Sequence, residues 1–67
     1  MRLQINGDEK NFADGLTLAG LIAQLDMKAD RVAVELNRSI VRRQDWIATP
    51  VEDGAEIEVV WFVGGGA

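Results

Sequence analysis

The residues with the clearest chemical potential are the last four, Gly64, Gly65, Gly66 and Ala67, which follow directly on a β-branched and aromatic run. Glycine has no side chain, so its backbone can approach another molecule closely. We therefore expect a flexible tail, residues 64–67, that enters a narrow channel and presents its terminal carboxylate to a partner's active site. A frayed terminus without a function is the alternative, since disorder collects at chain ends.

Catalytic groups are scarce in the rest of the chain. It contains no cysteine and no histidine, which excludes a thiol nucleophile, a disulfide and a histidine base or metal ligand. The acidic pairs Asp8-Glu9 and Glu52-Asp53 fall at expected turns and are interpreted as solvated. The three glycines do not resemble a phosphate-binding loop, which needs a following helix and lysine. We expect no catalytic residue, no metal site and no cofactor, and hence no enzyme.

The composition predicts one small soluble domain. The chain has 67 residues and a net charge of −4, from 11 acidic and 7 basic side chains. This balance argues against nucleic acid, which requires a basic surface. The basic cluster Arg38, Arg42 and Arg43 is interpreted as a solvated loop or as a contact with an acidic patch on a partner. Without a membrane-length apolar run or a signal peptide, we expect a cytoplasmic protein that is monomeric when free.

The N-terminal residues predict a β-hairpin. Leu3 and Ile5 alternate with polar residues, as in a strand with one buried face. The dipeptide Asn6-Gly7 is typical of a type I′ turn, which joins antiparallel strands. A second strand is therefore expected near residues 9–13, with Phe12 as its apolar anchor.

A helix is predicted to follow. Thr17 is a good N-cap, because its hydroxyl can accept a hydrogen bond from a free N–H of the first turn. Apolar residues then recur at helical spacing on one face: Leu18, Leu21, Ile22 and Leu25. Gly20 lies inside this helix, where it is either simply tolerated or required by a tight contact with the sheet.

The second half of the chain predicts mainly strands. Residues 31–36 form a strand with Val32, Val34 and Leu36 on one side and Ala33 and Glu35 on the other. A short edge strand is expected at Ile40-Val41, and one helical turn over residues 44–47 places Trp46 against the core. The last strand begins near Glu56. Tight turns precede the edge strand and the last strand, at Asn37-Arg38 and Asp53-Gly54.

This order of elements fits one helix packed on one face of a mixed sheet of four to five strands. The hairpin makes the first pair antiparallel, and the helical crossover lets the next long strand run parallel in the same sheet. The predicted fold class is α+β, in the β-grasp arrangement of ubiquitin-like proteins. Residues 1–63 form the domain and residues 64–67 the tail.

The last strand has two different faces in this interpretation. Alternation puts Ile57, Val59, Trp61 and, if the strand continues, Val63 on the side that the helix covers. Glu58, Val60 and Phe62 share the other side. Exposed Val60 and Phe62 beside the tail predict a partner-binding patch, with Glu58 on the same face. Alternatively, both faces are partly covered or Phe62 folds onto its neighbours.

Several segments together carry a family resemblance: Val32-Ala33-Val34-Glu35-Leu36-Asn37, Ile40-Val41, Arg43, Trp46, Asp53-Gly54, Ile57-Glu58-Val59-Val60 and Phe62-Val63-Gly64-Gly65-Gly66. Over nearly its whole length the chain resembles the ThiS family, the sulfur carriers of thiamine biosynthesis. The most specific part of this resemblance is the ending, in which the strand runs directly into the glycines. A di-glycine without the strand before it would be weak evidence.

The resemblance implies a sequence of partners. An ATP-using adenylating enzyme of the ThiF type would activate the terminal glycine carboxylate. A sulfur donor protein would then convert the acyl-adenylate to a thiocarboxylate, and the carrier would deliver this sulfur to the thiazole synthase ThiG. Gly65 and Gly66 match the family's di-glycine, so Gly66 would bear the sulfur. ATP and Mg²⁺ would be bound by the adenylating partner.

Two residues depart from the family pattern. Arg42 stands where many relatives have proline, and Ala67 follows the glycine at which the family normally ends. One added residue moves the carboxylate by up to ~3.3–3.6 Å. We therefore expect that Ala67 is removed before activation, unless it is foreign to the natural chain.

Two other functions stay open. The chain could be a carrier for a different pathway, such as the molybdopterin type. It could also be a ubiquitin-like interaction module that uses Val60 and Phe62 and leaves the tail idle.

Overall fold

The computed structural model describes residues 1–62. Its elements in chain order are β1 (Arg2–Ile5), β2 (Asp8–Asn11), α1 (Leu18–Gln24), the 3₁₀ helix η1 (Ala29–Arg31), β3 (Val32–Leu36), β4 (Ser39–Val41), the 3₁₀ helix η2 (Arg43–Ala48) and β5 (Glu56–Trp61). One α-helix and a mixed five-stranded sheet among these residues confirm the α+β class. Val63, the tail and the predicted boundary between domain and tail lie outside the described residues.

The strands are ordered β2-β1-β5-β3-β4, so the last strand of the chain lies at the centre of the sheet. β1 is antiparallel to β2 and parallel to β5, and β3 is antiparallel to both β5 and β4. These pairings confirm the hairpin, and they make β3 run in the direction of β2, as predicted. The sequence did not predict that β5 is inserted between β1 and β3.

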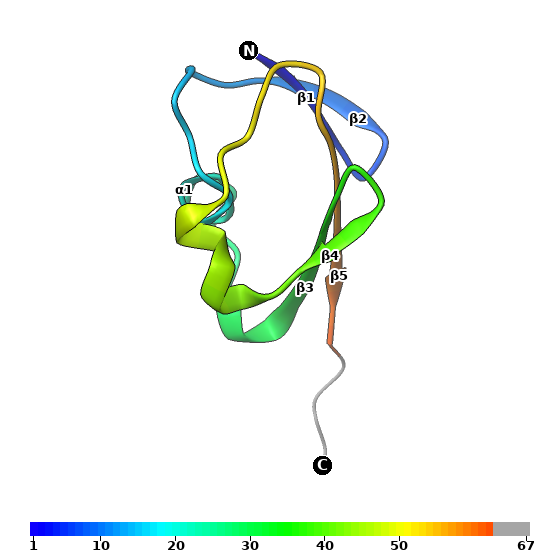
Figure 1. The fold of residues 1–67 in the computed structure, drawn as a ribbon. Coiled ribbons are helices and arrows are strands. Elements are labelled where there is room, and N and C mark those ends of the chain that lie inside the picture. The colour runs from blue at the N-terminus through cyan, green and yellow to red at the C-terminus, as the bar shows by residue number, and fades with distance from the viewer. Residues whose placement is uncertain (63–67) are drawn as a thin grey trace.

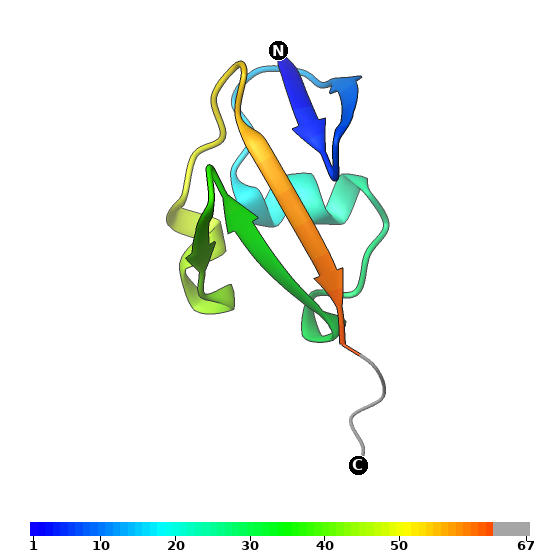
Figure 2. The same cartoon turned by 90° about the vertical axis from the view of Figure 1, so that its right-hand side faces the viewer.

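The sheet has one covered and one open side. Seen along the sheet, α1 and η2 both lie on the same side of the strands (Figure 1). Turned by a quarter, the molecule presents its strands to the viewer with α1 behind them (Figure 2). The core therefore occupies the space between the sheet and the two helical segments.

Helix α1 is capped and packed as its sequence predicts. The Thr17 hydroxyl accepts a hydrogen bond from the backbone N–H of Gly20 at 3.2 Å. Among the predicted apolar residues, Leu25 at the C-cap is partly buried, and three are fully buried: Leu18, Leu21 and Ile22. They pack against inward-facing residues of the sheet, which include Leu3, Ile5, Val34, Ile57 and Val59.

Gly20 is tolerated in this helix rather than required by the sheet. A Cβ atom added there would first meet the Leu16 side chain, at 3.4 Å from its Cδ2 atom, and then the Thr17 hydroxyl at 3.6 Å. Neither atom belongs to a strand. The alternative of a close contact between helix and sheet is therefore wrong.

Strand β2 begins one residue earlier than predicted and ends two residues earlier. The two-residue turn has positive φ angles, 51° at Asn6 and 88° at Gly7, and pairs Ile5 directly with Asp8. Phe12 lies just beyond the strand, donates its N–H to the Met1 carbonyl at 2.9 Å and packs against the core. It is the predicted anchor, although it lies outside the strand.

The two tryptophans differ in burial. Trp46 is buried within η2 and donates its Nε1–H to the Val41 carbonyl at 2.8 Å, which fastens η2 to the end of β4. Trp61 lies opposite the buried Val32 and so shares the side of Ile57 and Val59, as predicted, but it is 53% exposed. It ends β5 where that strand extends past α1 (Figure 2), so the helix does not cover it.

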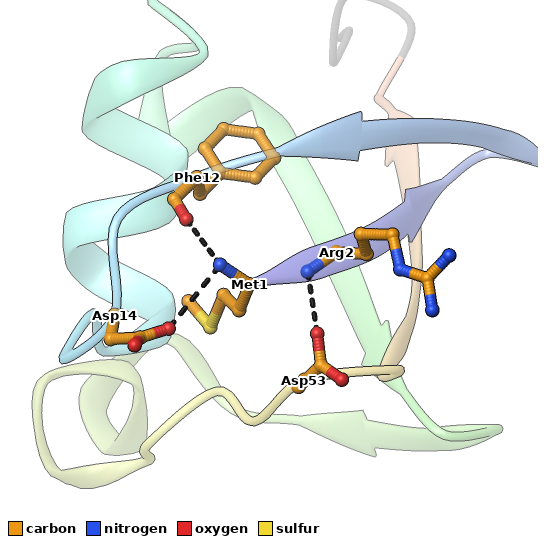
Figure 3. A network of polar contacts seen from close by, with 5 residues as sticks. All are labelled: Met1, Arg2, Phe12, Asp14 and Asp53. Carbon is orange, nitrogen blue, oxygen red and sulfur yellow. Dashed lines mark hydrogen bonds and ion pairs between the residues drawn. The ribbon is translucent and has the colours of Figure 1, made fainter.

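The opposite end of the sheet is closed by contacts of the first two residues (Figure 3). The ammonium group of Met1 donates to the Phe12 carbonyl at 2.6 Å and lies 3.2 Å from an Asp14 carboxylate oxygen. The N–H of Arg2 donates to the Asp53 carboxylate at 2.7 Å. These contacts fasten the start of β1 to the loop after β2 and to the turn before β5.

Candidate functional site: the open face of the sheet

The outer side of β5 carries the residues predicted to bind a partner. Ile57 and Val59 point into the core, whereas Glu58 and Val60 alternate with them and point away. Phe62 follows the strand, and it and Val60 are both 56% exposed. The structure thus brings Glu58 and Val60, two of the three predicted residues, onto the side of β5 that no helix covers, and the exposed Phe62 follows them directly after the strand.

The two neighbouring strands extend this surface. Ala33 on β3 lies opposite Val60, and Glu35 lies opposite Glu58. Ile40 on β4 lies opposite Glu35 and is 74% exposed. We call the following residues the docking face: Ala33, Glu35, Ile40, Glu58, Val60 and Phe62.

Half of the docking face was missed by reasoning from the sequence. Part of the signal was present, because a two-residue turn at Asn37-Arg38 pairs Leu36 with Ser39 and hence Glu35 with Ile40. The sequence pattern did not show which strand lies beside β5. Only the pairing of β5 with β3 joins Ala33, Glu35 and Ile40 to the face of the last strand.

Side-chain contacts across the sheet hold β5 in this register. Asn6 follows the end of β1, and its side-chain amide forms hydrogen bonds with both the N–H and the carbonyl of Val59. Its Oδ1 accepts from the Val59 N–H at 2.7 Å, and its Nδ2 donates to the Val59 carbonyl at 3.2 Å. Asn6 therefore continues the β1–β5 pairing beyond Ile5 and Ile57, up to the residue that precedes Val60.

A groove adjoins the docking face where β4 leaves the sheet. The pairing of β3 with β4 ends at Val34 and Val41, and Val32 has no partner on β4. The resulting cavity has a volume of about 250 Å³ and a mainly apolar lining that includes Val32, Ala33, Ile40, Trp46 and Phe62. Phe62 therefore belongs to the docking face and also lines this groove.

The basic cluster predicted from the sequence is divided by the fold. Arg42 and Arg43 line the groove. Arg38 lies at the tip of the β3–β4 hairpin, where its Nε atom is 3.7 Å from a Glu56 carboxylate oxygen. The three arginines therefore do not form one patch.

No metal-binding cluster is present within residues 1–62. These residues contain no group of three or more acidic side chains placed to hold a metal ion. None of their helices has the length and apolar character needed to cross a membrane. The acidic turn residue Asp53 is instead used structurally, as the acceptor for Arg2.

The described chain leaves the sheet at the border of the docking face. The N–H of Phe62 donates to the Arg31 carbonyl at 2.8 Å, which keeps the chain paired with the start of β3 up to this residue. The predicted tail residues Gly64, Gly65, Gly66 and Ala67 lie outside the described residues. Phe62, the last described residue, is held by this backbone hydrogen bond directly after β5.

Comparison with known proteins agrees with this architecture. The crystal structure of the thiamine biosynthesis protein ThiS from Geobacter metallireducens superimposes with a TM-score of 0.87, at 36% identity over 98% of this chain and 100% of that chain. The sulfur carrier protein ThiS of Escherichia coli is 32% identical over 66 residues, which cover 98% of this chain and 100% of the relative.

A different kind of relative is larger. A thiazole synthase of Paramagnetospirillum magneticum is 40% identical over 67 residues, which cover 100% of this chain but 21% of that protein. The chain thus spans about a fifth of the length of the thiazole synthases that it matches. The sequence model of the ThiS family matches residues 3–66, nearly the entire chain. This protein belongs to the ThiS family.

Proposed function

We propose that this protein is a sulfur carrier of thiamine biosynthesis, which holds sulfur as a thiocarboxylate on Gly66 once Ala67 has been removed. The observation that carries the proposal is the match to the ThiS family over residues 3–66, a range that includes the glycines after β5. The similarity to sulfur carrier proteins over their full length supports the same function.

The chemistry follows from the weak electrophilicity of a carboxylate. In the first step, a carboxylate oxygen of the terminal glycine attacks the α-phosphorus of ATP and pyrophosphate leaves. Sulfide (HS⁻), released by a donor protein, then attacks the acyl carbon of the acyl-adenylate, the bond to AMP breaks and AMP leaves, so that a thiocarboxylate remains. ATP and Mg²⁺ are bound by the adenylating partner, and thiazole synthase is the acceptor of the sulfur.

The carrier itself contributes recognition rather than catalysis. The docking face lies at the point where the chain leaves the sheet, so a protein bound there would have the following residues within reach. Glycines suit this role, because they allow the closest approach of a backbone to an active-site wall. The apolar side chains of Val60, Phe62 and Ile40 would supply contact area to the adenylating enzyme and the synthase.

Intact-mass spectrometry tests the proposal. The protein that ends at Gly66 is incubated with a ThiF-type adenylating enzyme, ATP, Mg²⁺ and inorganic sulfide, with ATP omitted in the control. The expected product has the mass gained by exchange of one oxygen for sulfur. An unchanged mass with this enzyme, but a thiocarboxylate with a molybdopterin-type activating enzyme, would assign another pathway. An unchanged mass with every activating enzyme would support an interaction module without covalent chemistry.

The tail is tested separately. Replacement of Gly65 by isoleucine adds a β-branched side chain next to the proposed sulfur-bearing residue and leaves residues 1–62 untouched. We expect unchanged circular dichroism and loss of activation, and retained activation would exclude a tail that enters a narrow channel. Chains that end at Gly66 and at Ala67, compared in the same assay, reveal which terminal carboxylate is used. Equal rates would exclude a need to remove Ala67.

A further inference from the structure

The docking face contains two carboxylates placed side by side. Glu35 on β3 and Glu58 on β5 are direct partners in the antiparallel register, so both project from the open side of adjacent strands. Directly opposite residues in such a pair have Cβ atoms about 4.5–5.5 Å apart, and like charges at this spacing destabilise a sheet. The fold gains nothing from this arrangement.

No cation compensates the pair within the described residues. The ion pairs of residues 1–62 join Arg38 to Glu56, Arg2 to Glu9 and the Met1 ammonium to Asp14. Glu56 provides the informative contrast, because it lies on the same strand and the same side, two residues before Glu58, and has an arginine partner. The next carboxylate along β5 faces another carboxylate instead.

Apolar side chains surround the carboxylate pair. Ile40 lies opposite Glu35 on the other side of β3, and Ala33 and Val60 form the next pair on the same side of the sheet. Ile40 and Val60 are among the most exposed large apolar residues that the structure describes. A protein that covers these residues must also cover Glu35 and Glu58 and remove water from them.

This geometry restricts the chemistry of the partner. A carboxylate that loses water is costly unless it is paired and hydrogen-bonded, and two adjacent carboxylates are more costly still. An entirely apolar partner surface would therefore bind the centre of the docking face weakly, because it would remove water from both carboxylates without pairing them. A cation that reaches between the two carboxylates would relieve both the desolvation and their mutual repulsion.

We infer that Glu35 and Glu58 form a joint receptor for a basic side chain of the adenylating enzyme, with Ile40 and Val60 as its apolar flanks. This inference rests on the proposed function, because it takes that enzyme as the occupant of the docking face. Arginine fits best, since its planar guanidinium presents donors in several directions at once and can bridge two carboxylates. The net charge of −4 would also steer a basic partner surface toward the carrier.

The test uses charge-removing substitutions with a matched control. Glu35→Gln and Glu58→Gln each keep the shape of the side chain and remove one charge. Glu52→Gln makes the same change of net charge at an exposed turn residue outside the docking face. Pyrophosphate release by the ThiF-type enzyme is measured against the concentration of each carrier, at low and high ionic strength, together with the melting temperature of each variant.

We expect each docking-face variant to raise the KM for the carrier about tenfold, which corresponds to about 1.4 kcal/mol, with little change in kcat. Added salt should raise the KM of the unmodified carrier steeply and that of the variants less, because a charge pair has been removed. The control Glu52→Gln should behave like the unmodified carrier. Melting temperatures of the docking-face variants should be equal or higher, since a repulsion within the fold is lost.

Other outcomes overturn the inference. A KM within twofold of that of the unmodified carrier for both variants would exclude the receptor. An equal rise in KM for Glu52→Gln would show that only the net charge of the carrier affects binding. A rise in KM accompanied by a lower melting temperature would assign the glutamates to the fold. In each of these cases the enzyme would still release pyrophosphate with the unmodified carrier. Failure of the proposed function is different, because no pyrophosphate would then be released even with the unmodified carrier.

Discussion

Two adjacent valines of β5 offer a direct test of the division between core and docking face. Val59 is 5% exposed and packs under α1, whereas Val60 is 56% exposed on the open side. The two residues share one strand, one side-chain type and nearly the same intrinsic strand preference. Replacement of each by alanine therefore removes the same atoms from two different environments.

The expected magnitudes follow from these exposures. Alanine lacks two of the carbon atoms of valine, which are worth about 1.6 kcal/mol when fully buried. Val59→Ala should lose nearly all of this and an additional cavity term, so the melting temperature should fall by at least about 6 °C for a domain of this size. Val60→Ala should lose less than half, about 0.7 kcal/mol, because much of its side chain is still exposed in the free protein.

The remaining part of Val60, about 0.9 kcal/mol, becomes available when a partner covers the docking face. Val60→Ala should therefore raise the KM of the adenylation reaction about fivefold. Val59→Ala should leave this KM nearly unchanged at a temperature where the variant is folded. The assay combines thermal unfolding with pyrophosphate release for both variants. Equal loss of stability, or an unchanged KM for Val60→Ala, would refute the assignment of the open side as the docking face.

Three further predictions concern single side chains. Phe62→Ala should impair activation more than stability, because the 56% of this side chain that is exposed offers a partner roughly 110 Å², or about 2–3 kcal/mol; a larger loss in urea unfolding than in binding would assign Phe62 to the core. Gly20→Ala should stabilise the protein by about 0.5–1 kcal/mol, because helix propensity improves and the nearest atom is the movable end of Leu16; a lower melting temperature would contradict this. Asp53→Ala should cost about 1 kcal/mol through the lost acceptor for Arg2, whereas Asp53→Asn should retain most of the stability, and equal unfolding midpoints for the two variants would exclude the hydrogen bond as the cause.

The sequence predicted the local structure well, because its signals are short-range. The Asn6-Gly7 turn, the Thr17 cap and the spacing of Leu18, Leu21 and Ile22 each depend on residues within one or two turns of one another. The outward direction of Val60 followed from the alternation of a single strand. These predictions are confirmed by the structure because no distant contact competes with them.

Predictions that depend on distant residues were less successful. The exposure of Trp61 depends on how far β5 extends past α1, a length that alternation does not contain. Half of the docking face depends on the insertion of β5 beside β3, which joins residues about 25 positions apart in the sequence. Each of these features is a property of packing rather than of pattern.

The central position of β5 links the stability of this protein to its recognition surface. Side chains alternate along a strand, so a slip of one residue would exchange Val59 with Val60 and put a carboxylate of Glu58 into the core. The register that buries Ile57 and Val59 is therefore the same register that displays Glu58 and Val60 beside Glu35. Asn6 binds both backbone groups of Val59 and so holds the strand at the residue between the two surfaces. Under the proposed function, a carrier with a displaced last strand would therefore present a different surface to the adenylating enzyme and bind it more weakly.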